Sequence, residues 1–334
     1  MENDNILEIR DLKVYYETDD ETVRAVNGVD IVLPRGKTLG LVGETGAGKT
    51  TTVLSILKLV ASPPGVIKGG SIKLDGREIL PLSELEMDKL RGNEASMIFQ
   101  DPMTSLNPVF TVGDQIAEVI AVHQDVTSAQ AKERAREMLE SVGIPGNRAD
   151  EYPHQFSGGM KQRVMIAIAL ACNPKLLIAD EPTTALDVTI QAQVLELMKS
   201  LRATYGTSMI MITHDLGIVA EVCDEVSIIY AGKIVEHGTL EDIFARTMHP
   251  YTEGLFNSLP NINDRKAELK PIKGLMADPA NLPPGCAFHP RCDYALDICA
   301  EKEPGQRAVT PTHSIRCHRY DEPGFKLSGG ANHE

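Results

Sequence analysis

Residues 43–50 read GETGAGKT, a pattern of residue types that can hold a phosphate group. Three glycines let the backbone curl so that successive N–H groups point into one hollow. An anion there lies against the start of the following helix, where Lys49 reaches its outer oxygens and the Thr50 hydroxyl can bind Mg²⁺. The run TLGLV before the loop is of strand type and the run after it has helical spacing, so the context fits a P-loop.

A second chemical pattern is KLLIADEP at residues 175–182, an apolar strand that ends in Asp180 and Glu181. Such a strand in a chain with a P-loop is typical of the second part of a nucleotide hydrolase. We expect Asp180 to hold Mg²⁺ through water and Glu181 to polarise the water that attacks the γ-phosphate.

A third pattern is FSGGMKQR at residues 156–163, followed by a helical run. Ser157, Gly158 and Gly159 would leave free N–H groups at the start of that helix. The chain therefore contains a second segment suited to phosphate.

Together these motifs resemble those of ATP-binding cassette (ABC) ATPases, in the family's order and across roughly residues 6–240. Gln100 in MIFQDP, the ALD segment at residues 185–187 and His214 in MITHD extend the resemblance. Residues 156–163 depart from the commoner family form, with Phe in place of Leu and Met in place of Gln. We expect this segment still to bind phosphate, because the Ser-Gly-Gly N–H groups are retained.

The resemblance implies a role for each matching residue. Glu181, His214, Lys49 and Gln100 would serve hydrolysis, and Thr50, Gln100 and Asp180 would hold Mg²⁺. Tyr16 lies where the family has an aromatic that stacks on adenine. The expected nucleotide contacts are Tyr16, Gly43, Glu44, Thr45, Gly46, Ala47, Gly48, Lys49, Thr50, Thr51, Ser157, Gly158, Gly159 and Asp187.

Four of the six cysteines lie near the end of the chain, at Cys286, Cys292, Cys299 and Cys317. Disulfides would not persist in a reducing cytosol. The wide spacing fits poorly with the close Cys pairs of zinc sites, and four thiolates can hold a 4Fe–4S cluster although this is not the ferredoxin spacing. We favour the cluster, with zinc or unliganded thiols as alternatives.

The tail, with HPYT at residues 249–252, resembles the C-terminal extension of ABC ATPases from oligopeptide and dipeptide importers. Some members of that family carry a 4Fe–4S cluster there. Because the cysteines are far along the chain from the P-loop, we expect their loss to change basal ATP hydrolysis little.

Strands and helices that alternate along the chain predict an α/β P-loop core with a mainly parallel sheet. Residues 6–33 predict an antiparallel β subdomain, and residues of about 101–170 an inserted α-helical subdomain. We therefore divide the chain into a nucleotide-binding domain, 1–247, and a small irregular cysteine-containing extension, 248–334, with a polar linker at 261–270.

Composition agrees with a cytosolic enzyme subunit, and the resemblance implies a peripheral place on the cytoplasmic face of the cell membrane. The formal net charge of −14 argues against a nucleic-acid-coating protein, and no apolar stretch approaches the length of a membrane span. The acidic start, MENDNILEIRD, lacks a signal-peptide core, so we expect the chain to stay in the cytosol.

The resemblance further implies partners: two transmembrane permease subunits, a second ABC ATPase that closes over ATP, and indirectly an extracytoplasmic peptide-binding protein. Import of nickel or another small solute, and a soluble ABC ATPase with a redox-sensing role, are the alternative functions. The sequence leaves open which solute is carried, whether the two ATPases are identical, and whether the cysteines are structural or regulatory.

Overall fold

The structure is a computed structural model that describes residues 4–184, 186–259, 270–321 and 324–327. The chain divides into two compact units, each described here by itself. The first unit comprises Met1–Leu7, Leu33–Thr38 and Lys73–Ile212, and the second comprises Glu8–Val32, Leu39–Ile72 and Thr213–Glu334.

The first unit contains strands and helices that alternate along most of its length. Its strands are β5 (Arg77–Glu78), β6 (Ala95–Ile98), β7 (Leu176–Asp180) and β8 (Ser208–Thr213, whose last residue falls in the second unit). Its α-helices are α2 (Glu84–Leu90), α3 (Pro102–Ser105), α4 (Val112–His123), α5 (Ser128–Ser141), α6 (Gly158–Leu170) and α7 (Val188–Tyr205), with 3₁₀ turns at Gly146–Asp150 and Pro153–Gln155.

Strands β6, β7 and β8 of the first unit are parallel and adjacent, with β7 in the middle. Leu176 pairs with Ala95 on one side and with Ser208 on the other. Every residue of β7 is buried, as expected for a parallel strand covered on both faces. The predicted parallel core is confirmed, and β7 carries the two predicted acids at its end.

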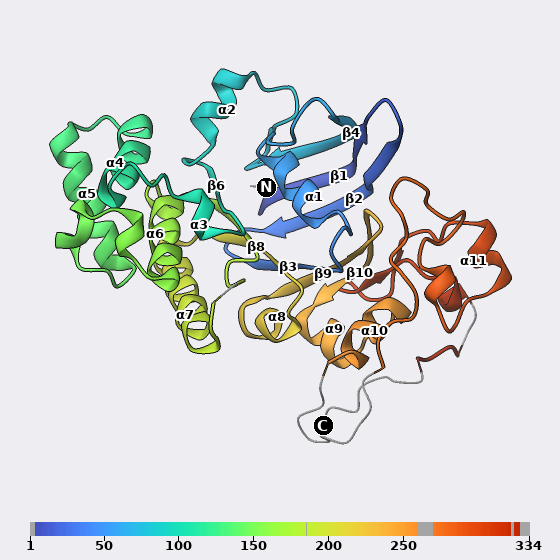
Figure 1. Cartoon of the computed structure of the whole chain (residues 1–334). Helices are drawn as coiled ribbons and strands as arrows, with labels where there is room; N and C mark the ends of the chain where they lie inside the picture. Colours follow the sequence, from blue (N-terminus) through green and yellow to red (C-terminus); the bar gives the residue numbers. More distant parts are fainter. Residues whose placement is uncertain (1–3, 185, 260–269, 322–323, 328–334) are drawn as a thin grey trace. The chain divides into compact units, whose positions relative to one another are not determined.

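Helices α4, α5 and α6 of the first unit lie together as a bundle (Figure 1). Thr111 and Thr127 cap α4 and α5 by accepting hydrogen bonds from backbone N–H groups inside the first turn. On α5, Ala131, Ala135 and Leu139 recur every four residues and are buried, so one face of this helix packs inward. These helices occupy the predicted helical insert.

The second unit contains most of the remaining elements. Its strands are β1 (Asn5–Glu17), β2 (Thr22–Pro34), β3 (Thr38–Val42), β4 (Gly65–Leu74), β9 (Glu225–Tyr230), β10 (Lys233–Thr239), β11 (Arg307–Ala308) and β12 (Ser314–Ile315); a few end residues of β1 to β4 fall in the first unit. Its α-helices are α1 (Lys49–Ile56), α8 (Leu216–Val222), α9 (Leu240–Ala245), α10 (Pro250–Asn257) and α11 (Asp297–Glu301), with 3₁₀ turns at His289–Arg291 and His318–Asp321.

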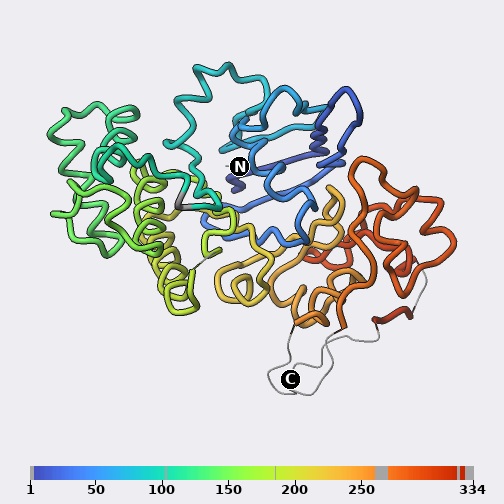
Figure 2. The backbone as a smooth tube through the Cα atoms, in the orientation of Figure 1, coloured from blue at the N-terminus to red at the C-terminus, as the bar shows by residue number. Residues whose placement is uncertain are grey.

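Two sets of strands organise the second unit. Strands β2, β1 and β4 follow one another in one sheet, which agrees with the β subdomain expected at residues 6–33. In the other set β3 pairs with β9 in parallel, and β9 with β10, β10 with β12, and β12 with β11 in antiparallel fashion. Strands β11 and β12 belong to the C-terminal extension, whose path is the orange-to-red tube of Figure 2.

A buried carboxylate ties the extension to β10. Glu236 is fully buried, and one of its oxygens lies 2.9 Å from Nε2 of His313, which is itself only 2% exposed. Its carboxylate also accepts hydrogen bonds from the backbone N–H groups of Met248 and His249. This polar cluster fixes β12 against β10. Burial of the His249 imidazole disfavours its charged form and lowers its pKa to about 4.

The compact units do not divide at residue 247, because the extension clusters with the P-loop segment. The boundary between residues 247 and 248 stays a prediction about sequence modules. Residues 261–269 of the predicted linker lie outside the described residues.

Candidate functional site

The P-loop lies in the second unit, between β3 and α1. Gly48 precedes α1 with φ of 102°, and no side chain caps this helix. A Cβ added to Gly48 would lie 2.3 Å from the backbone oxygen of Ala25, so only glycine fits there. No side chain caps the backbone N–H groups at the start of α1, an arrangement typical of anion sites.

Lys49 is buried to 7% exposure and rests on the loop's own carbonyls. Its Nζ donates to the backbone oxygen of Gly43 at 2.7 Å and to that of Glu44 at 3.0 Å. Thr45, Gly46 and Thr50 are exposed around it. The loop thus presents a positioned ammonium group and an open rim, which suits the binding of phosphate.

Tyr16 lies next to the same helix. Its hydroxyl is 3.3 Å from Oγ1 of Thr51, and its ring is half-buried. The structure therefore brings the aromatic that was predicted to stack on adenine, in β1, to the helix that follows the P-loop.

The predicted acids and Gln100 lie in the first unit. Asp180 is 4% exposed at the end of β7. Oε2 of Glu181 accepts hydrogen bonds from Nε2 of Gln100 at 2.9 Å and from Oγ1 of Thr184 at 3.0 Å. Gln100, which follows β6, thus contacts Glu181, which follows β7, and the roles of both residues stay predictions.

Glu181 also has an unusual backbone, with φ of +46°. A residue other than glycine adopts this left-handed conformation at an energetic cost, and such residues concentrate at functional sites. Its backbone N–H donates to the oxygen of Ile212 at 2.9 Å, which helps to hold this turn.

The Ser-Gly-Gly segment begins α6 in the first unit. Ser157 is the N-cap, and its side chain accepts from the N–H of Met160 over a long 3.4 Å. A Cβ on Gly159 would lie 2.5 Å from Cγ2 of Ile190, so this glycine allows α6 to approach α7 closely. Asp187 caps α7 by accepting from the N–H of Ile190 at 3.0 Å. The structure thus brings the predicted residues Gly159 and Asp187 to the same helix start.

The predicted residues are shared between the two units. The second unit contains Tyr16, the P-loop and His214, and the His214 side chain, directly after β8, is exposed. The first unit contains Gln100, Asp180, Glu181, the Ser-Gly-Gly segment and Asp187. Ala185, part of the ALD segment, lies outside the described residues. The role of each residue in hydrolysis stays a prediction.

Two residues of the extension contact the P-loop, and the sequence patterns did not predict either contact. Tyr251 accepts a hydrogen bond from the N–H of Glu44, and Arg291 forms an ion pair with the Glu44 carboxylate. Burial disfavours the charged form of Arg291, yet the Glu44 carboxylate holds the pKa of the Arg291 guanidinium above its usual range. Tyr251 belongs to the HPYT motif, but no local pattern relates it to a residue so far away in sequence.

The four cysteines of the extension line one small cavity, together with His249, His289 and His318. The backbone N–H of Cys286 donates to the oxygen of Cys299 at 2.8 Å, which holds two of them side by side. Burial raises the pKa of Cys292 to about 11 and that of Cys317 to about 12, so the thiols are neutral near pH 7 unless a cation is bound. Among the residues that the structure describes, no three His, Cys, Asp or Glu side chains are arranged to hold a metal ion.

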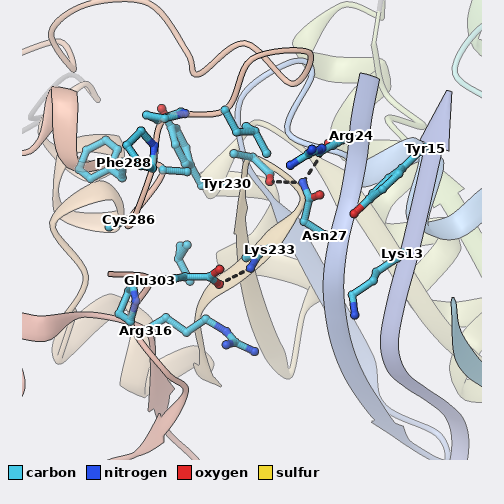
Figure 3. Close-up of a pocket in the computed structure, with 18 residues that line it drawn as sticks. Lys13, Tyr15, Arg24, Asn27, Tyr230, Lys233, Cys286, Phe288, Glu303 and Arg316 are labelled. Carbon is cyan, nitrogen blue, oxygen red and sulfur yellow. Dashed lines mark hydrogen bonds and ion pairs between the residues drawn. The ribbon is translucent and has the colours of Figure 1, made fainter. Parts of the chain in front are cut away.

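A larger pocket of about 400 Å³ lies between β1, β2 and the extension (Figure 3). Several cations line it, but Lys233 is paired with Glu303, and Arg316 with Asp30 at 3.4 Å. Asn27, held by the backbone oxygens of Arg24 and Ala231, closes one side. The positive charges of Lys233 and Arg316 are therefore balanced at this pocket.

No helix within the described ranges is long and apolar enough to cross a membrane. Comparison with protein families matches residues 26–184 to the family described as "ABC transporter". Residues 235–299 match "Oligopeptide/dipeptide transporter, C-terminal region".

Known relatives match almost the whole chain. The oligopeptide transport ATP-binding protein AppD of Bacillus subtilis is 52% identical over 97% of this chain and 99% of its own length. The OppD protein of Salmonella typhimurium is 49% identical over 94% of this chain and 93% of its own length.

Solved structures share the fold. A dimeric post-hydrolysis state of the ATP-binding cassette MJ0796, bound to ADP and phosphate, matches with a TM-score of 0.63 and 25% identity, over 70% of this chain and 98% of that one. The cbiO1 structure from Clostridium perfringens also has a TM-score of 0.63, at 28% identity over 73% of this chain and 92% of its own. The chain therefore belongs to the ATP-binding proteins of the ABC transporter family, in the group that carries the oligopeptide/dipeptide transporter C-terminal region.

Proposed function

We propose that this chain hydrolyses ATP to power the import of dipeptides and oligopeptides through an ABC transporter. The observation that carries the proposal is the presence, in one chain, of a preformed P-loop with buried Lys49 and of the C-terminal region shared with oligopeptide transport proteins. The first feature supports nucleotide chemistry and the second supports the class of solute.

In this function each group has a chemical task. Lys49 and the N–H groups of α1 bind and neutralise phosphate oxygens, and Tyr16 contacts the base. Glu181 directs the attacking water, and its bonds to Gln100 and Thr184 orient the carboxylate for that task. His214 contacts the γ-phosphate.

Mg²⁺ is the expected metal of the ATP site. Thr50, Asp180 and Gln100 offer a hydroxyl, a carboxylate and an amide oxygen, which are the hard donors that Mg²⁺ prefers. The hydrogen bond from Nε2 of Gln100 to Glu181 leaves the amide oxygen of Gln100 unused by that contact. When bound, the ion supplies charge neutralisation of the phosphates.

The partners follow from the transport function. The chain works at the cytoplasmic face of the membrane with two permease subunits and a second ABC ATPase, and an extracytoplasmic binding protein delivers the peptide. The Ser-Gly-Gly segment of each ATPase closes over the nucleotide on the P-loop of the other. One ATPase alone would leave the γ-phosphate open to water.

We further propose a 4Fe–4S cluster, with Zn²⁺ as the alternative, at Cys286, Cys292, Cys299 and Cys317. The cavity that these four thiols share supports this proposal, because four thiolates match the ligand set of one cubane, although the side chains would have to turn from their described positions to ligate it. The thiols of Cys292 and Cys317 would have to lose their protons on binding, so loading is expected to be weaker at low pH.

ATP hydrolysis in reconstituted membranes tests the transport function. The chain, its permeases and its sister ATPase are placed in vesicles, and phosphate release is measured with and without peptide-loaded binding protein. We expect peptide to accelerate hydrolysis, and Glu181→Gln to abolish the accelerated rate. Acceleration by nickel or a sugar in place of peptide would move the proposal to another solute.

A further inference from the structure

The extension holds a P-loop residue by a two-pronged ion pair. Nη1 of Arg291 lies 2.7 Å from Oε2 of Glu44, and Nη2 lies 3.1 Å from Oε1. The side chain of Arg291 is 6% exposed and that of Glu44 is 32% exposed. Paired arginine–carboxylate bonds of this kind fix orientation as well as distance, and partial burial protects them from solvent screening.

Arg291 is itself held in place from within the second unit. Its Nε donates to the backbone oxygen of Lys273 at 2.8 Å, and its guanidinium lies 5.8 Å from the ring centroid of Tyr230. Tyr230 packs edge-on against Phe288 at one wall of the pocket shown in Figure 3. The guanidinium therefore reaches the P-loop already oriented by the extension and β9.

The backbone of Glu44 is fixed by a second residue near the start of the extension. Its N–H donates to the hydroxyl of Tyr251 at 2.9 Å, and Tyr251 is fully buried against Tyr230 and Phe288. Glu44 is thus held at its side chain by Arg291 and at its backbone by Tyr251. Further along the loop, a Cβ on Gly46 would lie 3.1 Å from Cε of Met276, so the extension also lies against that glycine.

The position of Glu44 in turn bears on the phosphate-binding lysine. The backbone oxygen of Glu44 is one of the two carbonyls on which Nζ of Lys49 rests. A shift of Glu44 would therefore alter both the curl of the loop and the position of its ammonium group. A preorganised loop binds its anion more tightly because less ordering remains to be done on binding.

We infer that Arg291 is a positioning residue for nucleotide binding, which acts by fixing Glu44 and with it the P-loop. This inference rests on the proposed function of the P-loop and goes beyond it, since it gives the C-terminal extension a direct effect on nucleotide affinity. Arg291 immediately precedes Cys292, so the cysteine cavity and the Arg291–Glu44 ion pair are connected through adjacent residues of the chain.

The test compares MgATP affinity, measured with a fluorescent ATP analogue, across a small set of variants of the full chain. Arg291→Gln should raise Kd about tenfold, and Glu44→Gln should do the same, since each removes one side of a charge-assisted pair. The double variant should bind MgATP at most about tenfold more weakly than the unaltered chain, because the two changes break one interaction. Arg291→Lys, which keeps the charge but not the fork, should lose about threefold.

Lys273→Gln is the matched control. It removes a cation of the extension whose side chain is 75% exposed and paired with Asp293, and it leaves the backbone oxygen that Arg291 uses. Its Kd should match that of the unaltered chain. In steady-state hydrolysis Arg291→Gln should raise KM and leave kcat within about twofold, the pattern of lost binding and not of lost chemistry.

Several outcomes separate this inference from the function on which it rests. If the unaltered chain binds no ATP analogue, the proposed function fails. If it binds, and Arg291→Gln keeps both its melting temperature and its affinity, only the positioning role is overturned. Should Arg291→Gln unfold, Tyr251→Phe decides, because it removes only the hydroxyl that accepts from Glu44; we expect about threefold weaker binding, and unchanged binding would refute the inference.

Discussion

The P-loop and the Ser-Gly-Gly segment both place glycines before a helix, yet their surroundings differ. In the P-loop, Gly48 leaves α1 without a side-chain cap, and Lys49 is buried on the loop's own carbonyls. In the other segment, Ser157 caps α6 with a long bond, and Ser157 and Gly158 are exposed. The P-loop is additionally braced by Arg291 and Tyr251 of the same chain.

This difference indicates how the two segments are used. A braced loop that contains its own cation can bind phosphate within one chain. The Ser-Gly-Gly segment is an exposed helix start with small residues, and we expect its N–H groups to contribute when a nucleotide is brought to it. That division agrees with a site completed by a second subunit, and the related MJ0796 cassette has been solved as a dimer.

The largest effect is expected from Glu181→Gln. Loss of the carboxylate that directs water should lower hydrolysis about 10²–10⁴-fold, while ATP binding is retained. With Mg²⁺-ATP this variant should accumulate closed pairs, since each nucleotide then bridges two subunits, and gel filtration measures them. Near-normal phosphate release would show that Glu181 does not have this role.

Lys49→Ala tests the braced loop. The variant removes the ammonium group that lies on Gly43 and Glu44, so binding of the ATP analogue to the single chain should weaken about 100-fold. Equilibrium titration measures the change. Unaltered affinity would mean that the P-loop does not bind the phosphates in this chain.

Ser157→Arg tests the exposed segment, and the comparison predicts a different result for it. Bulk and charge at the start of α6 should leave the ATP affinity of the single chain within about twofold, because Ser157 does not belong to the P-loop. It should block pair formation in the Glu181→Gln background, as read by light scattering. A loss of affinity in the isolated chain would contradict the division of labour between the two segments.

The smallest effect on hydrolysis is expected at the cysteines. Cys292→Ser should bleach protein purified without oxygen and lower its iron from about four per chain, if the four thiols hold one cubane. We now expect hydrolysis at ATP concentrations below KM to fall by up to about threefold, with kcat hardly changed, because Arg291 next to Cys292 contacts the P-loop. This revises the expectation from sequence that hydrolysis would hardly change. One zinc and no iron in anaerobic protein would replace the cluster by the zinc alternative.

Much of the fold follows from local patterns in the sequence. The run VTIQAQVLELMKSLRATY has apolar residues at helical spacing and forms α7, and Ser83 is the N-cap of α2 in a capping box with Glu86. The glycine spacing of the P-loop and the acids at the end of β7 were likewise readable, because each signal lies within about ten residues.

The contacts of the extension were not readable in this way. Strand β12 has two residues, too few for a periodic pattern, and it is placed by pairing with β10. Arg291 lies 247 positions from Glu44, and its burial is decided by tertiary packing and not by its neighbours in sequence. The sequence could therefore indicate the chemistry of the P-loop but not what braces it.

Uptake of labelled peptide tests the central claim most directly. Vesicles that contain the permeases, the sister ATPase and this chain, with ATP on the side where this chain is located, are supplied with peptide-loaded binding protein. We predict ATP-dependent accumulation of peptide that is lost with Lys49→Ala and retained with Lys273→Gln. Equal peptide accumulation with Lys49→Ala, or with this chain left out, would contradict the account.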